Sequence, residues 1–196
     1  MLTPVIPGEL AAIVTSLEMR ERPRPRPLPA SPLRLNRWPA PTPEAYRTLF
    51  RRVGATWLWY SRLMLGDAAL TAIIQHPAVA LYAVLDGAGV EIGILELDFR
   101  TEGECEIAFI GLVPELTGKG HGCWLMAQAL ALGWRRDVTR MWVHTCTLDH
   151  PSALDFYRRN GFTPFARAIE TFADPRLIGV LPRDAAPQIP LIGPPS

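Results

Sequence analysis

The sequence predicts an α+β (mixed α/β) fold in which helices flank one central mixed β-sheet. Three strand-like runs follow one another with only short turns between them, which is typical of an antiparallel meander. Further along, a helix, a strand, a second helix and a last strand alternate, and this alternation is typical of a sheet covered by helices. No internal repeat is visible in this order of elements.

The regular part of the chain begins with helices. Thr42 is an N-cap residue, and Pro43 suits the first helical position because its missing N–H is not needed there. Apolar residues then recur at helical spacing until Gly54, which ends the helix. Two further helical stretches are predicted at residues 57–65 and 67–76.

The strands of the meander and the alternating elements follow these helices. Turn residues at 86–89 and 101–103 separate the three strands of the meander, and Gly161 occupies the C-terminal capping position of the last helix. In chain order the predicted elements are strands 79–85, 90–99 and 104–113, helix 120–132, strand 140–147, helix 151–160 and strand 162–171.

The length and composition suit one domain with proline-rich flanks. Of the 196 residues, 48% are hydrophobic and 20% are charged, so a sizeable core is possible. Residues 1–41 are expected to form a proline-rich N-terminal arm packed on the domain, residues 42–172 the domain itself, and residues 173–196 a proline-rich C-terminal tail. The Arg–Pro run at residues 22–27 could instead be a polyproline ligand for a partner protein.

Charge and hydropathy exclude several classes of partner. Lys and Arg number 20 against 19 Asp and Glu, and the net charge of +1 argues against a nucleic acid held by bulk charge. No apolar run is long enough to cross a membrane and no secretory signal is visible, so a cytoplasmic location is expected. The 3 cysteines suit reduced thiols. His144, Cys146 and His150 match no zinc spacing, so no metal is expected.

A glycine-rich loop joins the strand 104–113 to the helix after it. The loop reads VPELTGKGHG over residues 113–122. Its alternating glycines let backbone N–H groups approach a ligand closely, and the N-terminus of the following helix adds positive potential. Together these features predict a cradle for a pyrophosphate. The spacing differs from that of a P-loop, and the loop comes too late in the chain for a Rossmann fingerprint.

Two motifs resemble those of the GNAT superfamily, the Gcn5-related N-acetyltransferases. Residues 118–122 (GKGHG) resemble the family's motif A, with Thr117 where many members have Arg or Gln. Residues 150–162 (HPSALDFYRRNGF) resemble the family pattern N-x-x-A-x-x-F-Y-x-x-x-G-F, with His150 in place of the Asn. The resemblance covers residues 42–171 and implies the GNAT type of sheet, an antiparallel meander followed by parallel, splayed strands.

The resemblance also implies an activity and a set of residues. The activity is transfer of an acetyl group from acetyl-CoA to a primary amine of a small molecule or peptide, by direct attack in a ternary complex. Tyr157 matches the family's general acid, which protonates the leaving thiolate. The alternative is a non-enzymatic acyl-CoA-binding or protein-interaction module, and a homodimer is possible. The residues expected to bind acetyl-CoA are Leu112, Val113, Thr117, Gly118, Lys119, Gly120, His121, Gly122, Cys123, His150, Ala153 and Phe156.

Strand register suggests the general base. If residues 101–103 form a three-residue turn, Asp98 lies opposite Glu106, and side chains alternate between the two faces of the hairpin. One face then holds Glu96, Asp98, Glu104 and Glu106, and the other, core face holds Leu95, Leu97, Cys105, Ile107 and Phe109. Like charges this close raise one carboxyl pKa, which suits a base. Glu106, directly or through a water, is the predicted base and Glu96 the second candidate.

The same patch of carboxylates suggests the chemistry of the acceptor. Acidic groups that line a cleft attract cations. We therefore expect a cationic amine such as a polyamine, an aminoglycoside or the N-terminus of a peptide.

Overall fold

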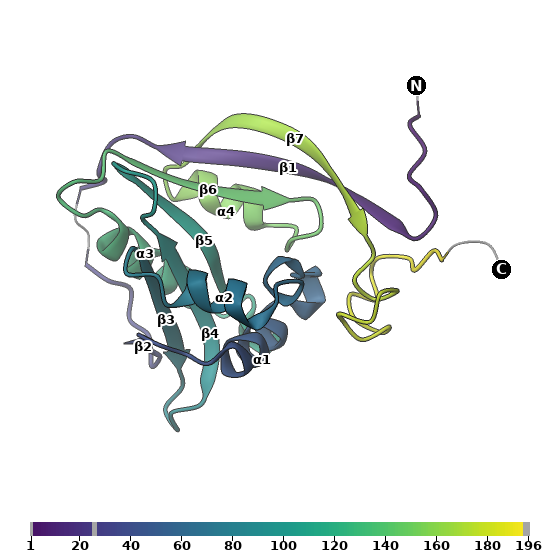
Figure 1. The fold of residues 1–196 in the computed structure, drawn as a ribbon. Coiled ribbons are helices and arrows are strands. Elements are labelled where there is room, and N and C mark those ends of the chain that lie inside the picture. Colours follow the sequence, from purple (N-terminus) through teal and green to yellow (C-terminus); the bar gives the residue numbers. More distant parts are fainter. Residues whose placement is uncertain (1, 25–26, 194–196) are drawn as a thin grey trace.

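Seven strands form a single mixed sheet (Figure 1). They are β1 (Glu9–Met19), β2 (Arg34–Arg37), β3 (Val79–Leu85), β4 (Glu91–Asp98), β5 (Glu104–Leu112), β6 (Arg140–Cys146) and β7 (Thr163–Ala173). Their order across the sheet is β2-β3-β4-β5-β6-β1-β7. The strands β3, β4 and β5 form the antiparallel meander, and β5 pairs with β6 in parallel, so the predicted fold class is confirmed. The computed structural model describes residues 2–24 and 27–193.

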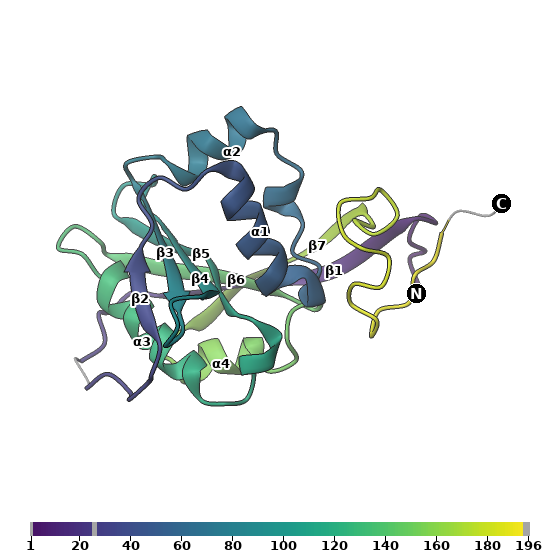
Figure 2. The ribbon, with the colours of Figure 1, turned by 90° about the horizontal axis from the view of Figure 1, so that it is seen from below.

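Helices cover both faces of the sheet. Figure 2 shows α1 (Pro43–Gly54) and α2 (Asp67–Ile74) on one face, and α3 (His121–Gly133) and α4 (Ala153–Arg159) on the other. Short 3₁₀ turns are η1 (Ala55–Trp57), η2 (Ser61–Leu63) and η3 (Pro114–Leu116). The helix α1 starts as predicted, because the side chain of Thr42 accepts a hydrogen bond from the backbone N–H of Ala45 at 3.2 Å. Within the described residues, no helix is both long enough and apolar enough to span a membrane.

The core lies on both sides of β3, β4 and β5. Tyr46 and Phe50 of α1 are completely buried against one face, and Leu125 and Met126 of α3 are buried on the other. The apolar residues of α1 recur every three or four positions, so one stripe of the helix faces the sheet. This packing fixes the two ends of the cleft described below, because α3 follows the glycine-rich loop and η1 follows α1.

The N-terminal segment contributes more to the sheet than an arm packed on its surface. The strand β1 lies inside the sheet between β6 and β7 and pairs antiparallel with both. Residues 9–19 contain no proline and alternate in burial, with Thr15, Leu17 and Met19 buried on one face, as a strand with one covered face requires. The proline-rich part after Met19, described at residues 20–24 and 27–33, leads from β1 to the edge strand β2, where missing N–H groups disrupt no ladder. Residues 25–26 of the Arg–Pro run lie outside the described residues.

The C-terminal tail is folded around a buried arginine. The strands β1 and β7 continue beyond β6 as a two-stranded ribbon, and the tail coils at its end (Figures 1 and 2). Arg176 is only 2% exposed and pairs with Asp174 at 2.7 Å. Its guanidinium also donates hydrogen bonds to tail carbonyls, including that of Ile189 at 2.8 Å. Gln188 then donates to the carbonyl of Thr56 at 2.8 Å, which ties the tail to η1.

The two parallel strands separate along their length. The strands β5 and β6 pair only at Glu104, Cys105 and Glu106, with Glu106 opposite Trp142. Beyond this point β5 runs on to Leu112 paired with β4 alone among the described strands. The splayed geometry that the family resemblance implied is therefore confirmed, and it opens a gap beside the second half of β5.

Candidate active site

A cleft of about 700 Å³ lies where β5 and β6 diverge. We call its two parts the donor half and the acceptor half. The donor half is lined by the loop 116–123 and by α4, through Ala153, Phe156 and Tyr157. The acceptor half is lined by residues from the connection after α1 and from β4, β5, β6, β1 and β7. These residues include Val14, Trp57, Trp59, Tyr60, Arg62, Asp98, Arg100, Glu106, Phe109, His144, Cys146, Glu170 and Phe172.

The loop of the donor half has the backbone that a phosphate cradle needs. Gly118 has φ +77° and Gly120 has φ +83°, both in the left-handed region that favours glycine. No atom lies within 4 Å of the position where a Cβ would stand on either glycine, so the space above the loop is open. Gly120 is the N-cap residue of α3, whose first N–H groups and helix dipole favour an anion there.

Most of the residues predicted to bind acetyl-CoA line this cleft. The ones that do are Leu112, Thr117, Gly118, Gly120, Gly122, Cys123, His150, Ala153 and Phe156. Val113, Lys119 and His121 are not part of the lining. Val113 is buried and its N–H donates to the carbonyl of Ile92 at 2.9 Å, while the His121 ring lies 3.3 Å from the hydroxyl of Ser31. The second half of β5 adds backbone groups that face the gap and are free of β6.

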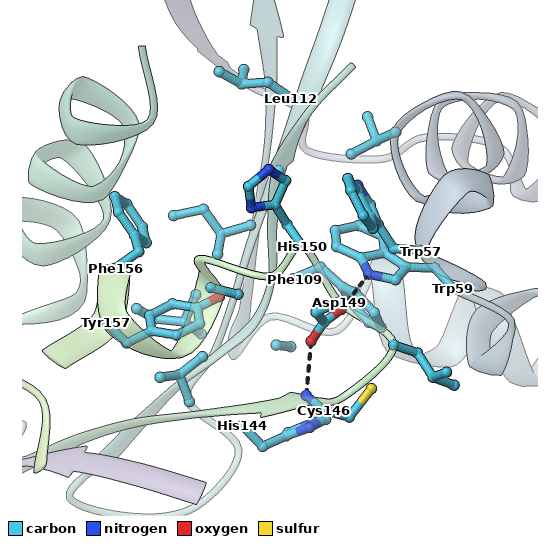
Figure 3. Close-up of a pocket in the computed structure, with 18 of the residues that line it drawn as sticks. Trp57, Trp59, Phe109, Leu112, His144, Cys146, Asp149, His150, Phe156 and Tyr157 are labelled. Carbon is cyan, nitrogen blue, oxygen red and sulfur yellow. Dashed lines mark hydrogen bonds between the residues drawn. The ribbon is translucent and has the colours of Figure 1, made fainter. Parts of the chain in front are cut away.

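Tyr157 faces the cleft from α4 (Figure 3). The side chain is nearly buried, with its ring edge-to-face against Phe156 and Phe162. Burial, together with the negative charge of Asp149, raises the pKa of Tyr157 well above its usual value. Within the described residues its hydroxyl has no hydrogen-bond partner, so a protonated hydroxyl is available to a ligand.

A β-bulge in the hairpin of β4 and β5 places one residue on a different face from the one predicted. Asp98 lies opposite Glu106 as expected, but the register shifts at Glu96 and Leu97, so that Glu96 lies opposite Phe109. The extra residue turns Phe109 to the face of Glu96. There its ring lies 4.8 Å from the ring of Phe50, measured between centroids. The placement of Phe109 on the other, core face was therefore wrong.

Three of the four predicted carboxylates are paired with arginines. Glu96 is completely buried; it accepts hydrogen bonds from Arg62 at 2.6 Å and from the hydroxyl of Tyr46 at 2.7 Å. It does not line the cleft, so the structure gives no support to Glu96 as a base. Asp98 and Glu104 are held in the same way, by Arg100 at 2.8 Å and by Arg140 at 3.0 Å. Three members of the patch are therefore neutralised, which leaves Glu106 as the member that could attract a cation, and the cationic acceptor stays a prediction.

Glu106 differs from these three carboxylates. Its side chain is 24% exposed and lines the cleft, and among the described residues its one ion-pair contact is with His144, whose Nε2 lies 3.8 Å from Oε1. Burial, followed by the charge of Asp98, raises the pKa of Glu106 to about 7. A carboxyl group with this pKa is half ionised near neutral pH and can accept a proton, which is what a general base requires. Glu106 as the base stays a prediction.

Several residues that line the acceptor half were not found from the sequence. Trp59 donates a hydrogen bond from Nε1 to Asp149 at 3.3 Å, across 90 residues of sequence, and Asp149 also accepts from the backbone N–H of Cys146 at 2.9 Å (Figure 3). Tyr60 stacks on Phe172 with centroids 4.3 Å apart. The sequence held a signal only for the residues that follow α1, because Trp57, Trp59 and Tyr60 lie close together in the chain and are all aromatic.

His150 stands opposite these aromatic residues. Its Nδ1 accepts a hydrogen bond from the N–H of Ser152 at 3.1 Å, and its ring meets Trp57 edge-to-face at 5.1 Å. Figure 3 shows it between Phe156 on one side and Trp57 on the other. Only Nε2 of this ring remains for a ligand. In residues 2–24 and 27–193 no group of three His, Cys, Asp or Glu side chains is arranged to hold a metal ion.

Comparisons with known proteins assign the family. The model of the acetyltransferase (GNAT) family matches residues 33–162. The chain belongs to the GNAT acetyltransferase family. A search of curated proteins found no match.

Solved structures share this fold. A GCN5-related N-acetyltransferase from Sphaerobacter thermophilus is 16% identical with a TM-score of 0.55, and the match covers 86% of this chain and 52% of that one. A functionally unknown conserved protein from Staphylococcus epidermidis ATCC 12228 is 13% identical with a TM-score of 0.53, covering 85% and 63%. An aminoglycoside acetyltransferase from an uncultured soil metagenomic sample, in complex with sisomicin, is 15% identical with a TM-score of 0.53, covering 66% and 88%. The chain thus spans about half to two thirds of the length of the first two.

Proposed function

We propose that this GNAT chain is an acetyl-CoA-dependent N-acetyltransferase that acetylates a primary amine by direct attack in a ternary complex. The observation that carries this proposal is the pairing of two groups in one cleft. Glu106 can accept a proton near neutral pH, and Tyr157 holds one that it can give up to a stronger base. The reaction needs both, because one proton must leave the amine and another must reach the leaving sulfur.

The donor half fits acetyl-CoA. The open space above Gly118 and Gly120 and the N-terminus of α3 suit the pyrophosphate. The backbone groups of residues 107–112 that face away from β4 suit the amides of the pantetheine arm. When bound, acetyl-CoA supplies the acetyl thioester. The same backbone groups would polarise its carbonyl oxygen.

The protein's own residues then move the protons. The carboxylate of Glu106 removes a proton from the acceptor's ammonium group, directly or through a water, which leaves a neutral amine. As the C–N bond forms and the C–S bond breaks, the hydroxyl of Tyr157 donates its proton to the departing sulfur. The second proton, which the nitrogen loses on becoming an amide, returns through solvent to the Tyr157 phenolate. A covalent route through Cys146 is less favoured, since burial, with the charge of Asp149, raises the pKa of its thiol to about 11.

The proposal includes a cytoplasmic location. The three cysteines are free, with Cys105 buried and Cys123 exposed, and this supports a reducing compartment. A homodimer remains a prediction.

The test is release of CoA thiol from acetyl-CoA in the presence of a panel of primary amines, with the acetylated product identified by mass spectrometry. We expect release that depends on the amine and is lost in the double variant Glu106→Gln, Tyr157→Phe. Tight binding of acetyl-CoA with no release for any amine would overturn the proposal and favour the acyl-CoA-binding module.

A further inference from the structure

The acceptor half contains two guanidinium groups beside the base. Arg62 and Arg100 both line the cleft, and each uses only part of its guanidinium in its ion pair. Arg62 donates from one Nη2 to Glu96, and Arg100 donates from Nε and Nη2 to Asp98. Among the described residues, nothing accepts a hydrogen bond from Nη1 of either arginine. The cleft therefore holds two unused Nη1 amino groups in addition to the proton acceptor Glu106, and the buried Nε of Arg62 also has no hydrogen-bond partner among the described residues.

A second, smaller cavity continues from the same place. Its volume is about 210 Å³, and it shares Asp98, Arg100 and Glu106 with the main cleft. Beyond these three residues it is bounded by Thr101, Glu104 and Trp142. A cavity of this size is smaller than the roughly 300–1,000 Å³ of pockets that enclose drug-sized ligands. Glu106 thus lies at the junction of the large cleft and a pocket for a small chemical group.

Two ion pairs flank this junction, while elsewhere in the cleft Asp149 and Glu170 accept hydrogen bonds from neutral donors. Glu96 and Arg62 form one neutral pair, and Asp98 and Arg100 form another. Beside Glu106, a polycation would meet the unused Nη1 groups of both arginines, which repel a second positive charge. A molecule that is itself neutral overall, with an ammonium group near Glu106 and an anionic group near the arginines, complements the arrangement. Guanidinium groups bind carboxylates strongly because the hydrogen bonds are charge-assisted.

We propose that the acceptor is an amino-acid-like zwitterion, in which a carboxylate close to the reacting amine binds Nη1 of Arg100 and Arg62. This inference rests on the proposed function and names the class of its acceptor. Glu106 holds the ammonium end, and the small cavity beside Trp142 accommodates the rest of a compact molecule. Arg62 is the more buried of the two arginines, and Arg100, with a side chain 42% exposed, is the one that meets the acceptor as it enters.

The test uses matched sets of acceptors with the full chain and acetyl-CoA. Each set contains an amino acid, its amide and the amine that lacks the carboxyl group, for α-amino acids such as phenylalanine and for ω-amino acids such as β-alanine. Spermidine and kanamycin represent the polycations. We expect kcat/KM to be about 10- to 100-fold higher for at least one amino acid than for its amide, the size of a charge-assisted contact.

A variant links this preference to the arginine. Arg100→Gln should bring the ratio of amino acid to amide close to 1, while Arg158→Gln, an exposed position on α4 outside the cleft, should keep the original ratio. Thermal unfolding of both variants shows that they are folded. A loss of the preference in Arg158→Gln, or its survival in Arg100→Gln, would contradict the assignment.

The outcomes separate the two proposals. If CoA is released with amines but the amides, the decarboxylated amines, spermidine or kanamycin are preferred, the acceptor class is wrong and the acetyltransferase function stands. If no amine of any class supports release, the proposed function itself fails.

Discussion

The donor half and the acceptor half of the cleft are assembled from different kinds of chain segment. The donor half comes from two continuous stretches of sequence: the loop 116–123, which presents its backbone, and the short helix α4, which presents side chains such as that of Tyr157. The acceptor half brings together side chains from five strands and from the connection after α1. Its contacts span the chain, and the hydrogen bond between Tyr60 and Glu170 joins residues 110 positions apart.

The two halves therefore depend on the fold to different degrees. A glycine loop before a helix keeps its conformation through local φ angles and a helix dipole, so it can be inherited as a unit. The acceptor half depends on long-range contacts such as the ion pair of Arg62 with Glu96, and such a contact needs the whole fold to hold its partners together. The acceptor half should therefore be the part whose residues change both chemistry and stability when they are replaced.

The largest effect is expected from removing the base of the acceptor half. Glu106→Gln should lower kcat/KM by about 10²- to 10⁴-fold, the usual contribution of general acid–base catalysis. The wild-type rate should rise with pH through about 7 as Glu106 ionises, and this limb should vanish in the variant, leaving the ionisation of the acceptor amine. The pH–rate profile measures both changes, and Glu102→Gln, at the exposed turn of the same hairpin, is the control.

The pH dependence of stability is an independent measure of the pKa of Glu106. The folded pKa of Glu106, about 7, lies above its ordinary value of 4.5, so the protonated group favours the fold. That contribution is present below pH 4.5 and is lost as the pH rises through 7. The groups whose charges act on this carboxyl are Asp98, Glu96, Arg62 and Arg100, with His144 beside it. The gain in unfolding free energy of Glu106→Gln over the wild type should therefore be larger at pH 8 than at pH 4. A gain that is larger at pH 4 would exclude a raised pKa of Glu106.

The next largest effect is on stability, and it comes from removing an ion pair of the acceptor half while Glu106 stays in place. Glu96→Ala leaves the Arg62 guanidinium buried without its carboxylate, which should lower the free energy of unfolding by about 3–5 kcal/mol. Glu104→Ala is the matched control in the same hairpin, since Arg140 stays paired with Glu18 at 2.6 Å. Breaking that more exposed pair should cost about 1 kcal/mol or less. Urea unfolding of the two variants would refute this comparison if their losses were equal.

In the donor half, a single hydroxyl is expected to affect turnover alone. Tyr157→Phe should lower kcat about 100-fold, since the leaving sulfur loses its proton donor, while the Kd of acetyl-CoA changes little. Tyr82→Phe, on β3 outside the cleft, should change neither quantity. Stopped-flow turnover and calorimetric binding measure the two quantities separately. Unchanged turnover would remove Tyr157 from the mechanism, and a large loss of affinity would make it a binding residue instead.

The extent of what could be predicted from the sequence follows the same division. The glycine loop, the α4 motif and the strand bounds of the meander depend on local patterns, and most of the residues expected at the donor half line the cleft. The pairing of Asp98 with Glu106 also followed from the length of one turn. These features need only short-range information, because turn length and φ preference act within a few residues.

Long-range features escaped prediction for physical reasons. The insertion of β1 between β6 and β7 depends on which strand edges are free once the whole sheet has formed, although the proline-free alternation of residues 9–19 was visible. The bulge that turns Phe109 has no glycine to mark it. The prediction of the carboxylate patch did not include the arginines that pair with it. Arg62 is 34 residues from Glu96, so no local pattern indicates that pair. Arg100 is two residues from Asp98 on the same face of the strand, and this pair could have been predicted from the sequence.

The smallest effect tests the backbone of the donor half itself. Gly118→Ala places a Cβ in open space, so the only penalty is the left-handed φ of +77°, about 1–2 kcal/mol for a residue other than glycine. If the loop relaxes to relieve this strain, binding must restore the cradle, and the Kd of acetyl-CoA should rise about 5- to 30-fold with kcat unchanged. Gly87→Ala is the control, because its Cβ would also meet nothing and its φ is not in the left-handed region. A variant that unfolds more easily but binds acetyl-CoA as tightly as the wild type would show that the strain is held by the fold. In that case the left-handed conformation of Gly118 would be needed to form the turn and not to bind the pyrophosphate.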